Sequence, residues 1–119
     1  MVPATLVLGS DAAARETAIA AALENEPEAA ALILEGMADG ADKFGAFSAL
    51  PLHIARIAPG CPCCSGNLTM RVTLNRMLRL RPARLYIGLA SAGHLSGIRD
   101  FLSQPPYDTL LTLTDDLHA

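Results

Sequence analysis

The chain has 119 residues, 51% of them hydrophobic and 18% charged, which is typical of a single globular domain over residues 1–119 and not of a disordered chain. A net charge of −3, with 4% aromatic residues and no tryptophan, argues against a nucleic-acid-binding protein. Because no apolar run approaches the roughly 20 residues of a membrane span and no charged leader precedes the first apolar run, we expect a cytoplasmic protein with no membrane contact.

Short apolar strands alternate with helical patterns along the chain, and this alternation is typical of βαβ units. Ser10 or Asp11 can cap the first helix and Asn67 the second, because side-chain oxygens there accept hydrogen bonds from free backbone N–H groups. In chain order we expect strand Ala4–Gly9, helix Ala12–Asn25, strand Ala30–Glu35, a long loop or short irregular helix Gly36–Ala49, strand Leu52–Ala58, loop Pro59–Gly66, helix Asn67–Leu80, strand Arg84–Leu89, helix His94–Gln104, strand Thr109–Thr114 and a frayed tail Asp115–Ala119.

Two of these elements also indicate how they pack. The strand Leu52–Ala58 alternates only partly between apolar and polar residues, which favours an edge or a partly exposed position in the sheet. The helix Asn67–Leu80 has one apolar stripe, which we expect to face the sheet. The residues of this stripe are Met70, Leu74, Met77 and Leu78.

The predicted fold is therefore α/β, a three-layer sandwich with a mainly parallel sheet of about five strands and helices on its faces. In such sheets, binding sites lie in the loops that follow the carboxyl ends of the strands. Two of these loops carry residues with distinctive chemistry. One follows Gly9, and the other contains all three cysteines.

The cysteine loop has the pattern C-x-C-C, formed by Cys61, Cys63 and Cys64. Thiolates are soft ligands that suit Zn²⁺ and similar ions, and a following helix N-terminus favours the thiolate form. Gly60 and Gly66 let the backbone fold back so that the sulfurs converge. A metal site is the preferred interpretation, and its fourth ligand is His53, His94, a water molecule or a residue from a second copy of the chain.

Two other interpretations of the cysteines remain open. The pair Cys61 and Cys64 forms a CxxC between a strand and a helix, which thiol redox proteins share. The three thiols can also be incidental or buried residues. An odd number of closely spaced cysteines is a poor framework for structural disulfides.

The loop after the first strand has the layout of a phosphate-binding loop, whose consensus is G-x-x-x-x-G-K-[ST]. In the same register the chain has Gly9 at the first glycine, Ala14 at the second, Arg15 at the lysine and Glu16 at the magnesium-binding hydroxyl, followed by Thr17. Gly9, Arg15 and Thr17 are thus the residues of a degenerate nucleotide site.

The run Gly60-Cys61-Pro62-Cys63-Cys64, followed by a helix and then a strand, resembles the GC-x-CC signature block of CobW-like P-loop GTPases. The segments Ala90-Ser91-Ala92-Gly93 and Thr109–Asp115 are similar to the family's next two blocks. The resemblance implies a P-loop fold, a Zn²⁺ or Co²⁺ site at the cysteines and a role in metal delivery or homeostasis.

The chain departs from that family where nucleotide chemistry needs particular groups. Catalysis requires a lysine on the phosphates and a hydroxyl on Mg²⁺, whereas the chain has Arg15 and Glu16. Ala90 replaces a carboxylate that the family carries, and no guanine-reading Asn-Lys-x-Asp motif is present. We therefore expect a non-catalytic metal-binding protein in which GTP and Mg²⁺ are not cofactors. The alternative is a weak GTP-binding protein that uses Gly9, Arg15 and Thr17.

Five arginines crowd the stretch Arg71–Arg84, although the whole chain is acidic. Such a run is usually the solvated face of a helix and its exit loop. The other interpretation is a docking face for an acidic protein partner. A homodimer is a further expectation, because a second chain can complete the metal site.

Overall fold

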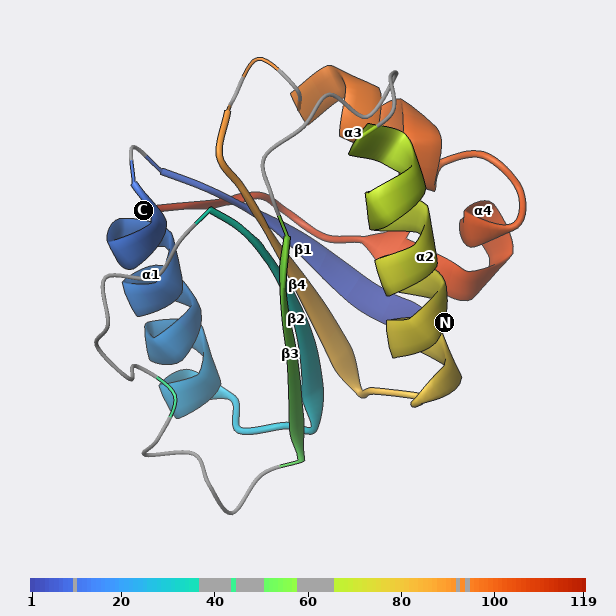
Figure 1. Cartoon of the computed structure of the whole chain (residues 1–119). Coiled ribbons are helices and arrows are strands. Elements are labelled where there is room, and N and C mark those ends of the chain that lie inside the picture. The colour runs from blue at the N-terminus through green and yellow to red at the C-terminus, as the bar shows by residue number, and fades with distance from the viewer. Residues whose placement is uncertain (10, 37–43, 45–50, 58–65, 92, 94) are drawn as a thin grey trace.

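Six parallel strands form one sheet at the centre of the computed structural model, which describes residues 1–9, 11–36, 44, 51–57, 66–91, 93 and 95–119 (Figure 1). The elements are, in chain order, β1 (Val2–Leu8), α1 (Ala12–Asn25), β2 (Ala30–Glu35), β3 (Leu52–Ile57), α2 (Gly66–Arg79), β4 (Arg84–Leu89), α3 (Leu95–Leu102), α4 (Tyr107–Leu110), β5 (Leu111–Leu113) and β6 (Leu117–His118).

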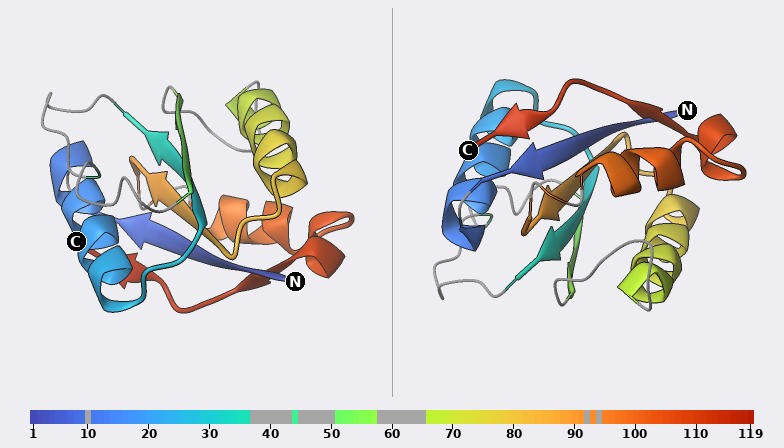
Figure 2. Two further views of the ribbon diagram at one scale, coloured as in Figure 1. Left: turned by 90° about the horizontal axis from the view of Figure 1, so that it is seen from below. Right: turned by 90° about the horizontal axis from the view of Figure 1, so that it is seen from above.

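The strand order is β3-β2-β4-β1-β5, and β6 also pairs with β1. Every pairing is parallel, so the carboxyl ends of the strands share one edge. Helix α1 covers one face of the sheet, while α2, α3 and α4 cover the other (Figures 1 and 2). This arrangement confirms the predicted three-layer α/β sandwich, and β3 lies at the edge, as its partial alternation predicts.

Helix α1 begins where the sequence predicts, because Asp11 caps it. The Asp11 carboxylate accepts a hydrogen bond from the backbone N–H of Ala14 at 2.7 Å. The helix ends at Asn25, and Pro27 follows two residues later. Its buried residues are Ile19 and Leu23, together with the charged residues Arg15 and Glu16, which belong to the candidate site.

Helix α2 packs on the sheet through the stripe that the sequence predicts. Met70, Leu74 and Met77 are buried, and Leu78 is half-buried. The helix begins at Gly66 and ends at Arg79, one residue earlier at each end than expected. The side chain of Asn67, the expected cap, lies outside the described residues.

Successive side chains of the central strands point to opposite faces of the sheet and pack into two separate hydrophobic cores. Val7, Leu32, Leu34 and Tyr86 pack against α1. On the other face, apolar residues of the same strands pack against α2, α3 and α4. The main residues of that second core are Leu6, Ile33, Leu85, Ile87, Met70, Leu74, Met77, Ile98 and Leu102.

The C-terminal part of the chain departs from the prediction. The tail is not frayed, because β6 pairs with β1 at Val7 and Leu8 and the N–H of Ala119 donates to the Leu8 carbonyl at 2.7 Å. Two residues cannot form a stable strand by themselves, and the pairing with β1 holds β6 in the sheet. The predicted strand Thr109–Thr114 also begins later, because its first two residues belong to α4.

No helix in the described part of the chain is long and apolar enough to cross a lipid bilayer.

Two tyrosines predict how the fold responds to alkaline pH. Burial raises the pKa of Tyr86, against the opposing charge of Arg84, and burial likewise raises the pKa of Tyr107. The folded state therefore holds these phenolic protons more tightly than the unfolded chain. The stabilisation is complete below the unfolded pKa of about 10 and is lost as pH rises through the folded pKa.

Urea denaturation at pH 9, 10 and 11 checks this expectation. The free energy of unfolding should fall with pH in the unmodified chain, and it should fall less steeply in Tyr86→Phe. Tyr107→Phe should show the same flattening, with an additional loss at every pH, because the Tyr107 hydroxyl donates to Asn75 Oδ1 at 2.7 Å. An unchanged slope in both variants would contradict the assignment.

Candidate functional site

The loop after β1 lies at the carboxyl edge of the sheet, where sites of parallel α/β proteins are found. Strand β1 ends at Leu8, Gly9 follows, and α1 begins at Ala12. This strand–glycine–helix order is the layout of a phosphate-binding loop, as the sequence predicts. Ser10 lies outside the described residues.

The side chain of Arg15 fills the space beside this loop. Arg15 is only 4% exposed, although it carries a full positive charge. Its Nη1 donates to the carbonyl oxygen of Gly9 and its Nη2 to that of Glu35, both at 3.0 Å. The guanidinium therefore ties the end of β1 to the end of β2, and it turns inward instead of toward a bound anion.

Three glycines create the room that Arg15 occupies. A Cβ atom on Gly9 would lie 3.0 Å from Arg15 Cγ, and one on Gly36 would lie 3.3 Å from Arg15 Nη2. A Cβ on Gly88, in β4, would contact Arg15 Nε at 3.9 Å. Gly36 also has φ +95°, which side chains with a Cβ rarely adopt. The arginine thus lies along a channel whose walls include these three glycines.

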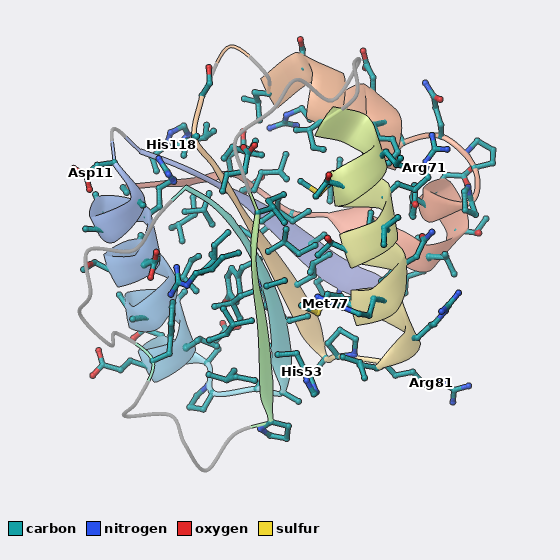
Figure 3. The ribbon with its side chains drawn as sticks, viewed as in Figure 1. Asp11, His53, Arg71, Met77, Arg81 and His118 are labelled. Carbon is teal, nitrogen blue, oxygen red and sulfur yellow. The ribbon has the colours of Figure 1, made fainter. Side chains whose placement is uncertain are left out.

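The C-terminal segment covers the same loop from another direction. A Cβ on Gly9 would lie 2.8 Å from the Cβ of Ala119, which is closer than real Cβ atoms approach. Figure 3 shows His118, the residue before it, beside the N-terminal end of α1 that carries Asp11. Arg15 and Ala119 thus both lie against Gly9, the first glycine of the predicted phosphate-binding loop.

Glu16 is paired with an arginine of the edge strand. Glu16 is 3% exposed and accepts two hydrogen bonds from Arg56, with Nη1 to Oε2 at 2.8 Å and Nη2 to Oε1 at 3.1 Å. The hydrogen bond to Glu16 raises the pKa of Arg56, while partial burial opposes the shift. This two-point contact joins α1 to β3 and pairs the carboxylate that stands where the phosphate-loop consensus has a hydroxyl.

Glu35 ends β2 at the same edge and is 4% exposed. Its Oε1 accepts a hydrogen bond from the backbone N–H of Ala90 at 3.0 Å, just after β4. Ala90 is the position where the resemblance implies a carboxylate. In this fold a carboxylate from the neighbouring strand contacts the backbone at that position instead.

Of the three residues predicted for the degenerate nucleotide site, Gly9 and Arg15 lie together and Thr17 does not. Thr17 is exposed, and its hydroxyl donates to the Ala13 carbonyl one turn back in α1 at 2.9 Å. Neither Arg56 nor Glu35 is predicted as a site residue from the sequence. Each is a charged residue late in a predicted strand, which indicates the carboxyl edge of a sheet but does not identify a partner.

The proposed metal ligands Cys61, Cys63 and Cys64 lie outside the described residues, as does His94. The described neighbours are Ile57, at the carboxyl end of β3, and Gly66, at the start of α2. His53 is exposed and lies near the opposite end of β3 from Ile57 (Figure 3). Within the described ranges, no cluster of three or more His, Cys, Asp and Glu residues could hold a metal ion.

Comparison with protein families, with curated proteins and with solved structures finds no match to this chain.

Proposed function

We propose that this chain is a non-catalytic metal-binding module in which Cys61, Cys63 and Cys64 supply thiolate ligands for Zn²⁺ or Co²⁺. Its role would be metal delivery or homeostasis in the reducing cytoplasm, where cysteines stay available as ligands. The single observation that carries the non-catalytic part is the buried side chain of Arg15. The metal-binding part rests on the C-x-C-C pattern and on its place in the chain.

The place of the cysteines supports a metal site at the carboxyl edge of the sheet. Their segment leaves the edge strand β3 at Ile57 and enters α2 at Gly66. The positive end of a 14-residue helix favours thiolate over thiol near its first turn. Three thiolates form a soft donor set that suits zinc or cobalt, and a fourth ligand must complete a tetrahedral site.

The hydrogen bonds of Arg15 oppose the alternative of GTP binding. To meet a nucleotide phosphate, the Arg15 guanidinium would have to leave the carbonyl oxygens of Gly9 and Glu35. The nucleotide would also need Mg²⁺, whose hydroxyl ligand is replaced by Glu16, already paired with Arg56. We therefore expect no GTP hydrolysis.

Metal analysis of protein purified anaerobically without an affinity tag tests the proposal. About one equivalent of zinc or cobalt per site is expected, with thiolate-to-metal absorption bands after Co²⁺ titration. The triple variant Cys61→Ser, Cys63→Ser, Cys64→Ser should bind none. His53→Ala is the matched control and should retain the metal, because His53 lies at the other end of β3.

Metal-free protein whose thermal stability is unchanged by added zinc would refute the metal-binding part, because a ligand that binds the folded state must raise its stability. The non-catalytic part has a separate test. A thermal shift with millimolar GTP and Mg²⁺ would contradict it and would favour the nucleotide-binding alternative.

A further inference from the structure

The outer face of α2 combines exposed apolar residues with a row of arginines. Met70, Leu74 and Met77 face the sheet, so residues half a turn away face outward. On that outward side, Leu68 is 65% exposed and Val72 is 61% exposed. Arg76 and Arg79 continue the same stripe at helical spacing. An exposed apolar pair within a basic stripe is typical of a binding surface.

The charge of this region is unbalanced. Helix α2 contains no acidic residue, and Arg71, Arg76, Arg79 and Arg81 are all exposed. None of the four is within ion-pair distance of a carboxylate in the part of the chain that the structure describes. The other described exposed or half-exposed arginines are paired: Arg56 with Glu16, Arg84 with Glu28 and Arg99 with Asp116. A cluster of four positive charges thus stands on a chain of net charge −3.

The structure corrects the extent of the basic face that the sequence suggests. Arg84 does not belong to it, because Arg84 lies over the Tyr86 ring on the α1 side of the sheet and pairs there with Glu28. We define the α2 surface as Leu68, Arg71, Val72, Arg76, Arg79 and Arg81. Figure 3 shows Arg71 on the side of α2 nearest α3 and α4, and Arg81 pointing away from the sheet.

A hollow of about 240 Å³ opens beside Arg71, between α2 and the segment that joins α3 to α4. Its walls include Phe101 and Tyr107, whose rings pack edge to face at 5.1 Å, and Arg71 lies over the Phe101 ring at 5.8 Å. The hydrogen bond from Tyr107 to Asn75 fixes the wall nearest α2. The hollow combines ring and proline surface with the polar side chains of Asn75 and Gln104. An apolar side chain can pack on its rings, and an acidic neighbour would meet Arg71.

We propose that the α2 surface binds an acidic amphipathic helix of a partner protein, with one apolar side chain of that helix in the hollow. Leucines four residues apart on the partner would meet Leu68 and Val72, and flanking glutamates would meet the arginines. Charge complementarity selects this partner, because the surface offers four cations with no acidic neighbour on its own helix. The interaction is separate from metal binding by the cysteines and can be tested without metal.

The probe is a fluorescein-labelled helical peptide of roughly 18 residues with leucines on one face and glutamates beside them, long enough to form helix on contact. Fluorescence anisotropy should show saturable binding that weakens with salt. Arg76→Glu combined with Arg79→Glu, and separately Val72→Glu, should each weaken binding about tenfold or more. Ile54→Glu is the matched control and should leave binding unchanged, because Ile54 is 41% exposed and alternates away from Ala55, which packs on the α2 side.

Several outcomes would overturn the proposal. One is equal binding of a peptide in which every glutamate is replaced by glutamine, and another is an equal loss in Ile54→Glu. Binding to phosphatidylserine vesicles or to duplex DNA in place of the peptide would assign the surface to a membrane or a nucleic acid. A micromolar dimer that Arg76→Glu with Arg79→Glu separates would assign it to a second copy of the chain. Circular dichroism of every variant confirms that the fold is intact.

Discussion

Replacing Arg15 with alanine is expected to lower the free energy of unfolding by about 3 kcal/mol, a large share of the total stability of a domain of this size. The change removes hydrogen bonds to the carbonyls of Gly9 and Glu35. It also leaves a void, because three of the residues beside Arg15 are glycines, which have no side chains to fill it. Urea denaturation followed by circular dichroism measures the effect.

Two further variants separate these causes. Arg15→Met keeps most of the aliphatic stem and removes only the guanidinium, so it should cost about half as much as alanine. Thr17→Ala is the matched control in the same helix and should change stability by less than about 0.5 kcal/mol, because Thr17 is exposed. If Arg15→Ala proves as neutral as Thr17→Ala, the arginine does not brace the strand ends.

Breaking the ion pair between Glu16 and Arg56 should lower the free energy of unfolding by different amounts, depending on which partner is replaced. Arg56→Ala leaves a carboxylate that is 3% exposed without its cation, and a loss of about 3 kcal/mol is expected. Glu16→Gln leaves an arginine that is 39% exposed and can turn to solvent, so a loss of about 1 kcal/mol is expected. Urea titrations at pH 7 compare the two variants.

The double variant tests the cause of this asymmetry. Glu16→Gln added to Arg56→Ala should recover most of the stability, because no buried charge then remains at that position. Equal losses in the two single variants, with no recovery in the double variant, would show that the contact is an ordinary surface pair.

The sequence predicts the central elements well, because each has its own local signals. The bounds of α1, β2 and β4 agree with expectation, and Asp11 caps α1 as its side chain and position indicate. The strand order and the existence of β6 could not be predicted from the sequence. Only the pairing with Val7 and Leu8 makes residues 117–118 a strand, and no periodicity exists in two residues.

The candidate site is predicted only where its residues are close in sequence. Gly9 and Arg15 lie six positions apart, and alignment with the phosphate-loop consensus identifies both of them. Glu16 and Arg56 lie 40 positions apart, and Glu35 and Ala90 lie 55 apart. Short-range patterns cannot say which distant side chains meet, because the order of strands decides it. The sequence could therefore place Arg15 near the start of the first helix, close to Gly9, but could not show that its side chain points inward.

The channel that holds Arg15 has a consequence for attempts to build a working nucleotide site in this protein. Changing Arg15 to the consensus lysine removes the paired hydrogen bonds to the carbonyls of Gly9 and Glu35. Changing Glu16 to threonine leaves Arg56 without its counterion. Each replacement alone removes contacts that stabilise the fold, so a variant that carries both is expected to be less stable than the unmodified chain. A nucleotide site engineered at this loop therefore calls for compensating substitutions elsewhere in the fold.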